Sequence, residues 1–144
     1  MTSDNIPIWI NKFIGIPFVE KGRSHDGVDC WGLVCLIYSE RFKIELPDYT
    51  DGYPNTKAQK EISALVEAEA KLWQAVERGK EQLGDVVLFA IYGATTHVGM
   101  VVESGWMVSA EKGIDSVLES YTTNKWKQRV RGFFRHKDMN GKYS

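Results

Sequence analysis

The chain has 144 residues, of which 43% are hydrophobic and 26% are charged, and its formal net charge is −1. This length suits a single domain with one core, so we expect one domain over residues 1–144. The small net charge gives no electrostatic reason to expect a nucleic acid or an anionic membrane as a partner.

The N-terminal residues, Met1–Asn5, contain no basic start followed by an apolar core. The sequence therefore predicts neither a signal peptide nor a membrane span, and we expect synthesis in the cytoplasm without a cleaved leader. Cys30 and Cys35 are the two cysteines. Five residues apart on a helix, they would point to different sides, so we expect no disulfide between them and assign Cys35 to the core.

Helical patterns occupy the first half of the chain. A short helix is predicted over residues 6–13 because apolar residues recur there after Pro7, which suits an early helical position. A buried helix is predicted from Cys30 to about Phe42, with Asp29 as its N-cap.

A second, amphipathic helix is predicted over Thr56–Arg78, ended by Gly79. Its apolar residues recur at helical spacing, with polar residues between them, and are Ile62, Leu65, Val66, Trp73 and Val76.

Strand patterns occupy the second half. The residues 93–96 and the pair Ser104-Gly105 read as turns between strands. The predicted strands, bounded by such turns, are Val86–Tyr92, His97–Val102, Trp106–Ser109, Gly113–Leu118 and Arg129–Arg135. Helices followed by an antiparallel meander indicate an α+β fold, with the buried helix packed on the sheet.

Cys30 is a candidate nucleophile because it starts the buried helix. Unpaired backbone N–H groups and the positive end of the helix dipole both favour a thiolate there. Such thiols titrate between about 3.5 and 7.5, against about 8.5 for a free cysteine. The amides of Cys30 and Trp31 are candidates for an oxyanion hole.

A thiol nucleophile needs a base, and the chain has three histidines. His97 opens a predicted strand after a turn of small residues, where its ring can be aimed at a neighbouring element. His25 lies in the loop before Cys30 and can line the same cleft, but a loop makes it a poorer base. His136 lies at the basic end of the last strand, and we expect it on the surface.

The imidazole also needs a third group to hold its tautomer and direction. Ser109 is the candidate, since it lies on the strand antiparallel to that of His97; an ordinary strand serine is an equally good interpretation. Glu111 shares the face of Ser109 and is the alternative if the strand register differs.

Several motifs in this order resemble the NlpC-type cysteine peptidases of bacterial cell walls, over about residues 10–135. They are Gly15-Ile16-Pro17-Phe18, Gly22, Asp29-Cys30-Trp31-Gly32-Leu33-Val34, Tyr38, Gly84-Asp85-Val86-Val87-Leu88-Phe89 and His97-Val98-Gly99-Met100. The resemblance implies a papain-like domain with Cys30 as nucleophile and His97 as base. It also implies cleavage of amide bonds in peptidoglycan stem peptides, often between D-glutamate and a diamino acid, with no metal or cofactor.

Three positions refine the resemblance. Tryptophan after the cysteine, Trp31, is similar to the phage-tail branch of the family, which implies other tail proteins as partners and a place in the virion. The family usually has histidine or another polar residue where this chain has Ser109, and often tyrosine where it has Phe18. Loss of an orienting partner is expected to slow catalysis without abolishing it.

Three functions remain open on this sequence. The first is a cysteine endopeptidase acting on peptidoglycan. The second is a structural or assembly protein of a phage tail that keeps the fold without useful turnover, as the departures at Ser109 and Phe18 suggest. The third is an enzyme that processes another amide or acyl substrate through the same thioester chemistry.

Overall fold

The computed structural model describes residues 5–47, 72–91 and 94–139 of the chain. The helical elements come early, as predicted. A 3-10 helix spans Ile8–Phe13, and α1 spans Cys30–Ile37, continued by a π-helical turn over Tyr38–Phe42. A short 3-10 helix, Lys137–Met139, follows the last strand. The predicted helical stretch from Cys30 to Phe42 is therefore confirmed.

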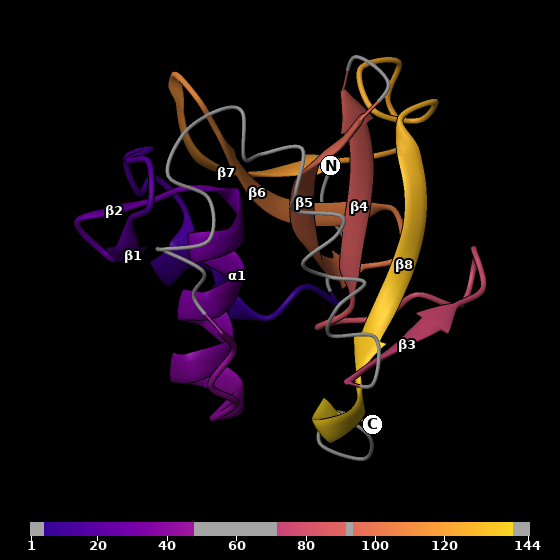
Figure 1. Cartoon of the computed structure of the whole chain (residues 1–144), viewed down its shortest axis with the longest axis horizontal. Helices are drawn as coiled ribbons and strands as arrows, with labels where there is room; N and C mark the ends of the chain where they lie inside the picture. The colour runs from indigo at the N-terminus through magenta and orange to yellow at the C-terminus, as the bar shows by residue number, and fades with distance from the viewer. Residues whose placement is uncertain (1–4, 48–71, 92–93, 140–144) are drawn as a thin grey trace.

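The described strands form a two-stranded hairpin and a six-stranded antiparallel sheet. The hairpin pairs β1 (Arg23–Ser24) with β2 (Gly27–Val28). In the large sheet the strands lie in the order β3-β8-β4-β5-β6-β7. Their bounds are Trp73–Val76 for β3, Val86–Ile91 for β4, Ala94–Glu103 for β5, Trp106–Glu111 for β6, Ile114–Ser120 for β7 and Val130–His136 for β8. Figure 1 shows α1 beside this sheet, on the side of β5 and β6. The predicted α+β class is confirmed.

The sequence prediction is wrong at the end of the proposed amphipathic helix. Trp73–Val76 is β3, an edge strand that pairs antiparallel with β8. The backbone groups of β8 offer this segment a full ladder of partners, and that tertiary pairing overrides the helical spacing of its apolar residues. The remainder of that prediction, residues 56–71, lies outside the described residues. A smaller correction concerns residues 93–96, since β5 already begins at Ala94.

Two apolar clusters lie on opposite faces of the sheet, as the alternation of its strands shows. In β5, Val98 and Met100 belong to the first cluster, which includes most of α1, whereas Val101 belongs to the second. In β6, Val108 belongs to the first and Met107 to the second. The second cluster contains Val87, Phe89, Val101, Met107, Tyr121, Trp126, Val130 and Phe133. We call these the helix-side cluster and the far-side cluster.

His136 is buried, with 3% of its surface exposed, so its predicted surface position is wrong. Its ring meets Trp73 edge-on at 4.9 Å and Tyr38 at 6.1 Å between centroids. The strand pairing that makes β3 thus also covers the histidine. Cys35 is buried in the helix-side cluster, as predicted, and both cysteines are free thiols.

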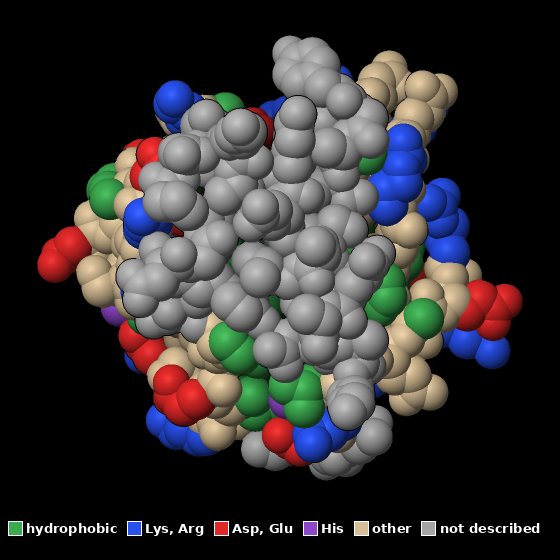
Figure 2. Space-filling model, viewed as in Figure 1, with side chains coloured by type: hydrophobic (Ala, Val, Ile, Leu, Met, Phe, Trp, Pro, Cys, Tyr) green, Lys and Arg blue, Asp and Glu red, His purple; other side chains and the backbone are tan. Residues whose placement is uncertain are grey.

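Charged side chains of both signs surround the visible face of the molecule (Figure 2). Among the described residues, no helix combines the length and the apolar character needed to cross a membrane.

Candidate active site

The start of α1 is held by the Asp29 side chain, as the sequence predicts. Its carboxylate accepts a hydrogen bond from the Gly32 amide at 2.7 Å, which caps the helix. It also accepts from the Lys21 amide at 2.9 Å and from the Arg23 guanidinium at 2.8 Å. One buried carboxylate therefore joins the loop before the helix to the helix start, and it places Cys30.

Glycines allow the loop to approach the helix this closely. A Cβ atom on Gly32 would lie 1.9 Å from the carbonyl oxygen of Gly22, and one on Gly22 would lie 2.3 Å from that of Gly27. Neither position tolerates a side chain without movement of the backbone. The glycines that the sequence marked as a loop are therefore packing requirements of the Cys30 site.

The Cys30 sulfur lies where α1 meets β5. Burial raises the pKa of the thiol to about 12, and the neighbouring Asp29 carboxylate raises it further. Interactions with the backbone of Val98 and Trp31, and the charge of Arg23, lower the pKa but do not compensate. The sequence predicted a thiolate from the helix start alone. The folded chain keeps a neutral thiol because the sulfur is enclosed and lies beside a carboxylate.

The interaction with Val98 brings the sulfur to the backbone directly after His97. In the described residues, the pairing of β5 with β6 extends from Glu103 back to Met100 and no further toward His97. The two strands thus separate where the Cys30 sulfur meets β5. The predicted nucleophile and the predicted base come together at this point of the sheet.

The His97 ring is 4% exposed and lies among aromatic rings of the far-side cluster. It stacks on Trp126 with 4.9 Å between centroids and 10° between planes, and it contacts Phe89 at 5.6 Å. Burial lowers the pKa of His97 to about 4; Glu111 raises it and Lys125 lowers it. The ring is therefore neutral at pH 7, and its buried Nε2 atom has no hydrogen-bond partner.

Neither predicted third group is hydrogen-bonded to this ring in the described structure. Ser109 is buried on β6, and only Gly99 separates it from β5: a Cβ on Gly99 would lie 3.4 Å from the Cβ of Ser109. Glu111 instead forms an ion pair with Lys125. A polar orienting group therefore lies close to His97 without contacting it.

The other residues predicted near the cleft have separate roles. His25 Nε2 lies 2.9 Å from a Glu40 carboxylate oxygen at the surface, and its ring packs on Phe13. Phe18 is partly buried against the helix-side cluster and bridges to Val28. The structure does not bring either residue to the Cys30 sulfur through any described contact.

The Trp31 side chain is buried rather than part of a cleft. Its Nε1 atom donates to the Pro47 carbonyl at 2.8 Å, and its ring lies 6.5 Å from that of Trp73. This residue anchors the helix start through its side chain, so only its backbone amide faces the sulfur.

Trp126 is the site residue that sequence reasoning missed. It lies in the basic stretch 125–137, which reads as a solvated strand face. A tryptophan among lysines and arginines was the available signal, because a large aromatic ring on a charged face needs a packing partner.

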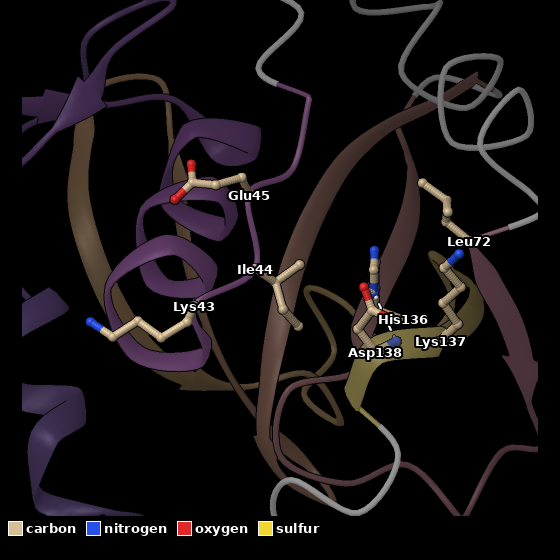
Figure 3. A pocket seen from close by; sticks show the side chains of 7 residues that line it. All are labelled: Lys43, Ile44, Glu45, Leu72, His136, Lys137 and Asp138. Carbon is tan, nitrogen blue, oxygen red and sulfur yellow. Dashed lines mark hydrogen bonds and ion pairs between the residues drawn. The ribbon is translucent and has the colours of Figure 1, made fainter.

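A cavity of about 460 Å³ lies elsewhere, below the C-terminal end of α1 (Figure 3). It is lined by Lys43, Ile44, Glu45, Leu72, His136, Lys137 and Asp138. None of these residues is a candidate for the cysteine chemistry. In the described part of the chain, no group of three or more histidine, cysteine, aspartate or glutamate side chains is placed to hold a metal ion.

Comparisons with known proteins agree with this arrangement. A model of the NlpC/P60 family matches residues 15–135. The murein DD-endopeptidase and LD-carboxypeptidase MepS of Escherichia coli K12 is 27% identical over 115 residues, which are 80% of this chain and 53% of MepS. The chain thus spans about half the length of that relative.

Two solved structures share the fold. An NlpC/P60 family protein from Bacillus cereus superposes with a TM-score of 0.66 at 23% identity, over 94% of this chain and 41% of that chain. The NlpC/p60 domain of the peptidoglycan hydrolase SagA superposes with a TM-score of 0.60 at 19% identity, over 92% of this chain and 97% of that chain. The papain-like arrangement of a nucleophile helix on an antiparallel sheet is consistent with both.

Proposed function

The chain belongs to the NlpC/P60 family, whose model covers residues 15–135, and on that premise we propose that it is a cysteine endopeptidase that hydrolyses amide bonds in peptidoglycan stem peptides. The observation that carries this proposal is the position of the Cys30 sulfur, which interacts with the backbone next to His97. The names of two relatives, a murein endopeptidase and a peptidoglycan hydrolase, support the substrate class.

In this proposal the reaction starts from a neutral thiol and a neutral imidazole. Cys30 attacks the amide carbonyl while His97 takes the thiol proton, and His97 then returns that proton to the leaving amine. Water hydrolyses the thioester in a second step, with His97 again as the base. Because burial opposes both charges at rest, the thiolate forms together with attack rather than before it.

The developing oxyanion needs N–H donors at the helix start. Two amides of the first turn are already used within the protein, since Gly32 donates to the Asp29 carboxylate and Leu33 donates to the Asp29 carbonyl. We therefore assign the oxyanion role to the amides of Cys30 and Trp31, the two preceding residues on α1.

The scissile bond and the biological setting are finer parts of the same proposal. We propose cleavage between D-glutamate and the diamino acid of the stem peptide, and association with a phage tail. The residues behind the second point are Trp31 after the nucleophile and the departures at Phe18 and Ser109. A γ-D-glutamyl-diaminopimelate dipeptide and a dipeptide with the α-linkage distinguish the bonds.

The test of the proposed function is release of new amines from purified peptidoglycan. Cys30→Ala is expected to reduce the rate by about 10⁴-fold or more, since removal of a nucleophile leaves only binding and the oxyanion hole. Cys35→Ala is the matched control, because it removes the other buried thiol of the same helix. Equal release by the wild type and Cys30→Ala would count against a cysteine peptidase.

One observation favours a second function, a tail assembly protein with little turnover: the His97 Nε2 atom lacks a polar partner. That function predicts tight association with tail proteins, unchanged in Cys30→Ala. Virions that assemble normally with Cys30→Ala but fail to penetrate the wall would contradict it.

A further inference from the structure

The His97 ring is held without a polar third residue in the described structure, although it is buried. Its Nε2 atom has no hydrogen-bond partner, and neither Ser109 nor Glu111 contacts it by a hydrogen bond. A ring that is not oriented by hydrogen bonds must take its direction from packing. The packing partner is Trp126, whose ring is parallel to the imidazole within 10°.

We propose that Trp126 is the positioning residue of His97, in place of the polar group that orients a catalytic imidazole elsewhere. This inference rests on the proposed function, because it concerns the base of the same reaction. Parallel stacking defines the plane of the imidazole, and both ring nitrogens lie in that plane. Rotation of the ring out of it would lose the stack and drive the ring toward Phe89, which lies 5.6 Å away and tilted by 44°.

Trp126 is itself held from three sides. Its Nε1 atom donates to the Glu119 carboxylate at 2.8 Å, which fixes the indole within its own plane. Phe89 packs against it at 4.6 Å between centroids, and the Lys125 ammonium lies 4.8 Å from its centroid. The indole is fully buried. A ring held in this way can set the direction of its neighbour.

The Lys125–Glu111 ion pair adds a charged frame around the same two rings. Lys125 lies over the indole, while its partner Glu111 is the acidic group whose charge acts on His97. The loop that carries Lys125 and Trp126 is thus tied to β6, beside the point where β5 and β6 separate. The stacked indole and this ion pair keep that loop against the site.

The experiment compares Trp126→Phe and Trp126→Leu with Phe133→Leu, a control that removes an aromatic ring from the same far-side cluster. We expect Trp126→Leu to lower kcat on the order of 10²-fold with KM within about twofold, since a misplaced catalytic group costs about that much. Trp126→Phe keeps a ring and is expected to lose less, on the order of tenfold. Phe133→Leu is expected to keep kcat within about threefold.

A second readout does not depend on activity. The ring protons of His97, assigned by comparison with His97→Gln, are expected to show a large upfield ring-current shift that disappears in Trp126→Leu. Glu119→Ala, which leaves the buried indole in place, is expected to reduce that shift. An unchanged His97 shift in a folded Trp126→Leu would overturn the proposal, and so would equal losses of kcat in Trp126→Leu and Phe133→Leu.

The two proposals fail separately. A wild type that releases no amine from peptidoglycan contradicts the proposed function, whereas the shift of the His97 ring protons still decides whether Trp126 sets the ring. An active wild type whose kcat and His97 shift are insensitive to Trp126 contradicts only the positioning role.

Discussion

The two halves of the candidate site are built from different kinds of contact. The nucleophile half is local: Asp29, Lys21, Arg23 and Gly32 hold Cys30, and all lie within eleven residues of one another along the chain. The imidazole half is assembled from distant segments.

The residues around His97 come from four parts of the chain. Phe89 is on β4, Glu111 ends β6, and Lys125 and Trp126 lie in the loop before β8. The difference teaches that the nucleophile can be placed by a loop and a helix start, while the base depends on the completed sheet. The nucleophile half is therefore sensitive to backbone crowding, and the imidazole half to packing and to the burial of charge.

The largest expected effect breaks the local half. Gly32→Ala places a Cβ 1.9 Å from the Gly22 carbonyl oxygen, and both atoms belong to closely packed backbone. We expect a loss of more than about 3 kcal/mol in the free energy of unfolding, at the upper end for overpacking. Urea denaturation measures it.

Gly132→Ala is the control for this crowding, since its Cβ would meet the side-chain ring of Phe134 at 3.1 Å rather than backbone. It is expected to cost clearly less. A Gly32→Ala protein as stable as the wild type would show that the loop is not pinned against α1.

The next effect sharpens the imidazole half through pH. His97 has its pKa lowered to about 4 in the folded chain against an ordinary 6.5, so the unfolded chain binds the proton more tightly. Stability from this group is present above about pH 6.5 and is lost as the pH falls toward 4. The loss reaches about 3 kcal/mol, from 1.36 kcal/mol per pKa unit.

His97→Gln removes this titration while Glu111 and Lys125, the charged groups that act on the ring, remain. Unfolding free energies measured at pH 7 and pH 4 are expected to fall more steeply for the wild type than for His97→Gln. Parallel pH dependence of the two proteins would mean that the ring is not buried as a neutral group.

The smallest effect separates the two ways of orienting the ring. Ser109→Ala is expected to change kcat by less than about threefold, because the serine makes no hydrogen bond to His97 in the described structure and the loss of a used donor would cost far more. The amine-release assay at saturating substrate measures it. A drop of 10²-fold or more would return the orienting role to Ser109.

Much of the fold and the nucleophile half of the site could be predicted from sequence, because the patterns that determine them are short. Asp29 before an apolar run predicts a capped helix at Cys30, and the five strand patterns correspond to β4–β8 with shifted ends. Trp73–Val76 was predicted wrongly because its partner, β8, lies about sixty residues later and the pairing leaves no local mark.

The ionisation of the site was decided by tertiary structure alone. A helix start lowers the pKa of a cysteine when the sulfur stays accessible, but whether Cys30 is enclosed depends on β5, and the sequence does not show how closely that strand approaches. His97 and Trp126 are 29 positions apart, yet their rings stack. The sequence by itself determined which residues carry the cysteine chemistry, because residue types and capping are local properties. Only the fold decided how those residues are charged and oriented, because burial and stacking depend on segments that meet when the sheet is complete.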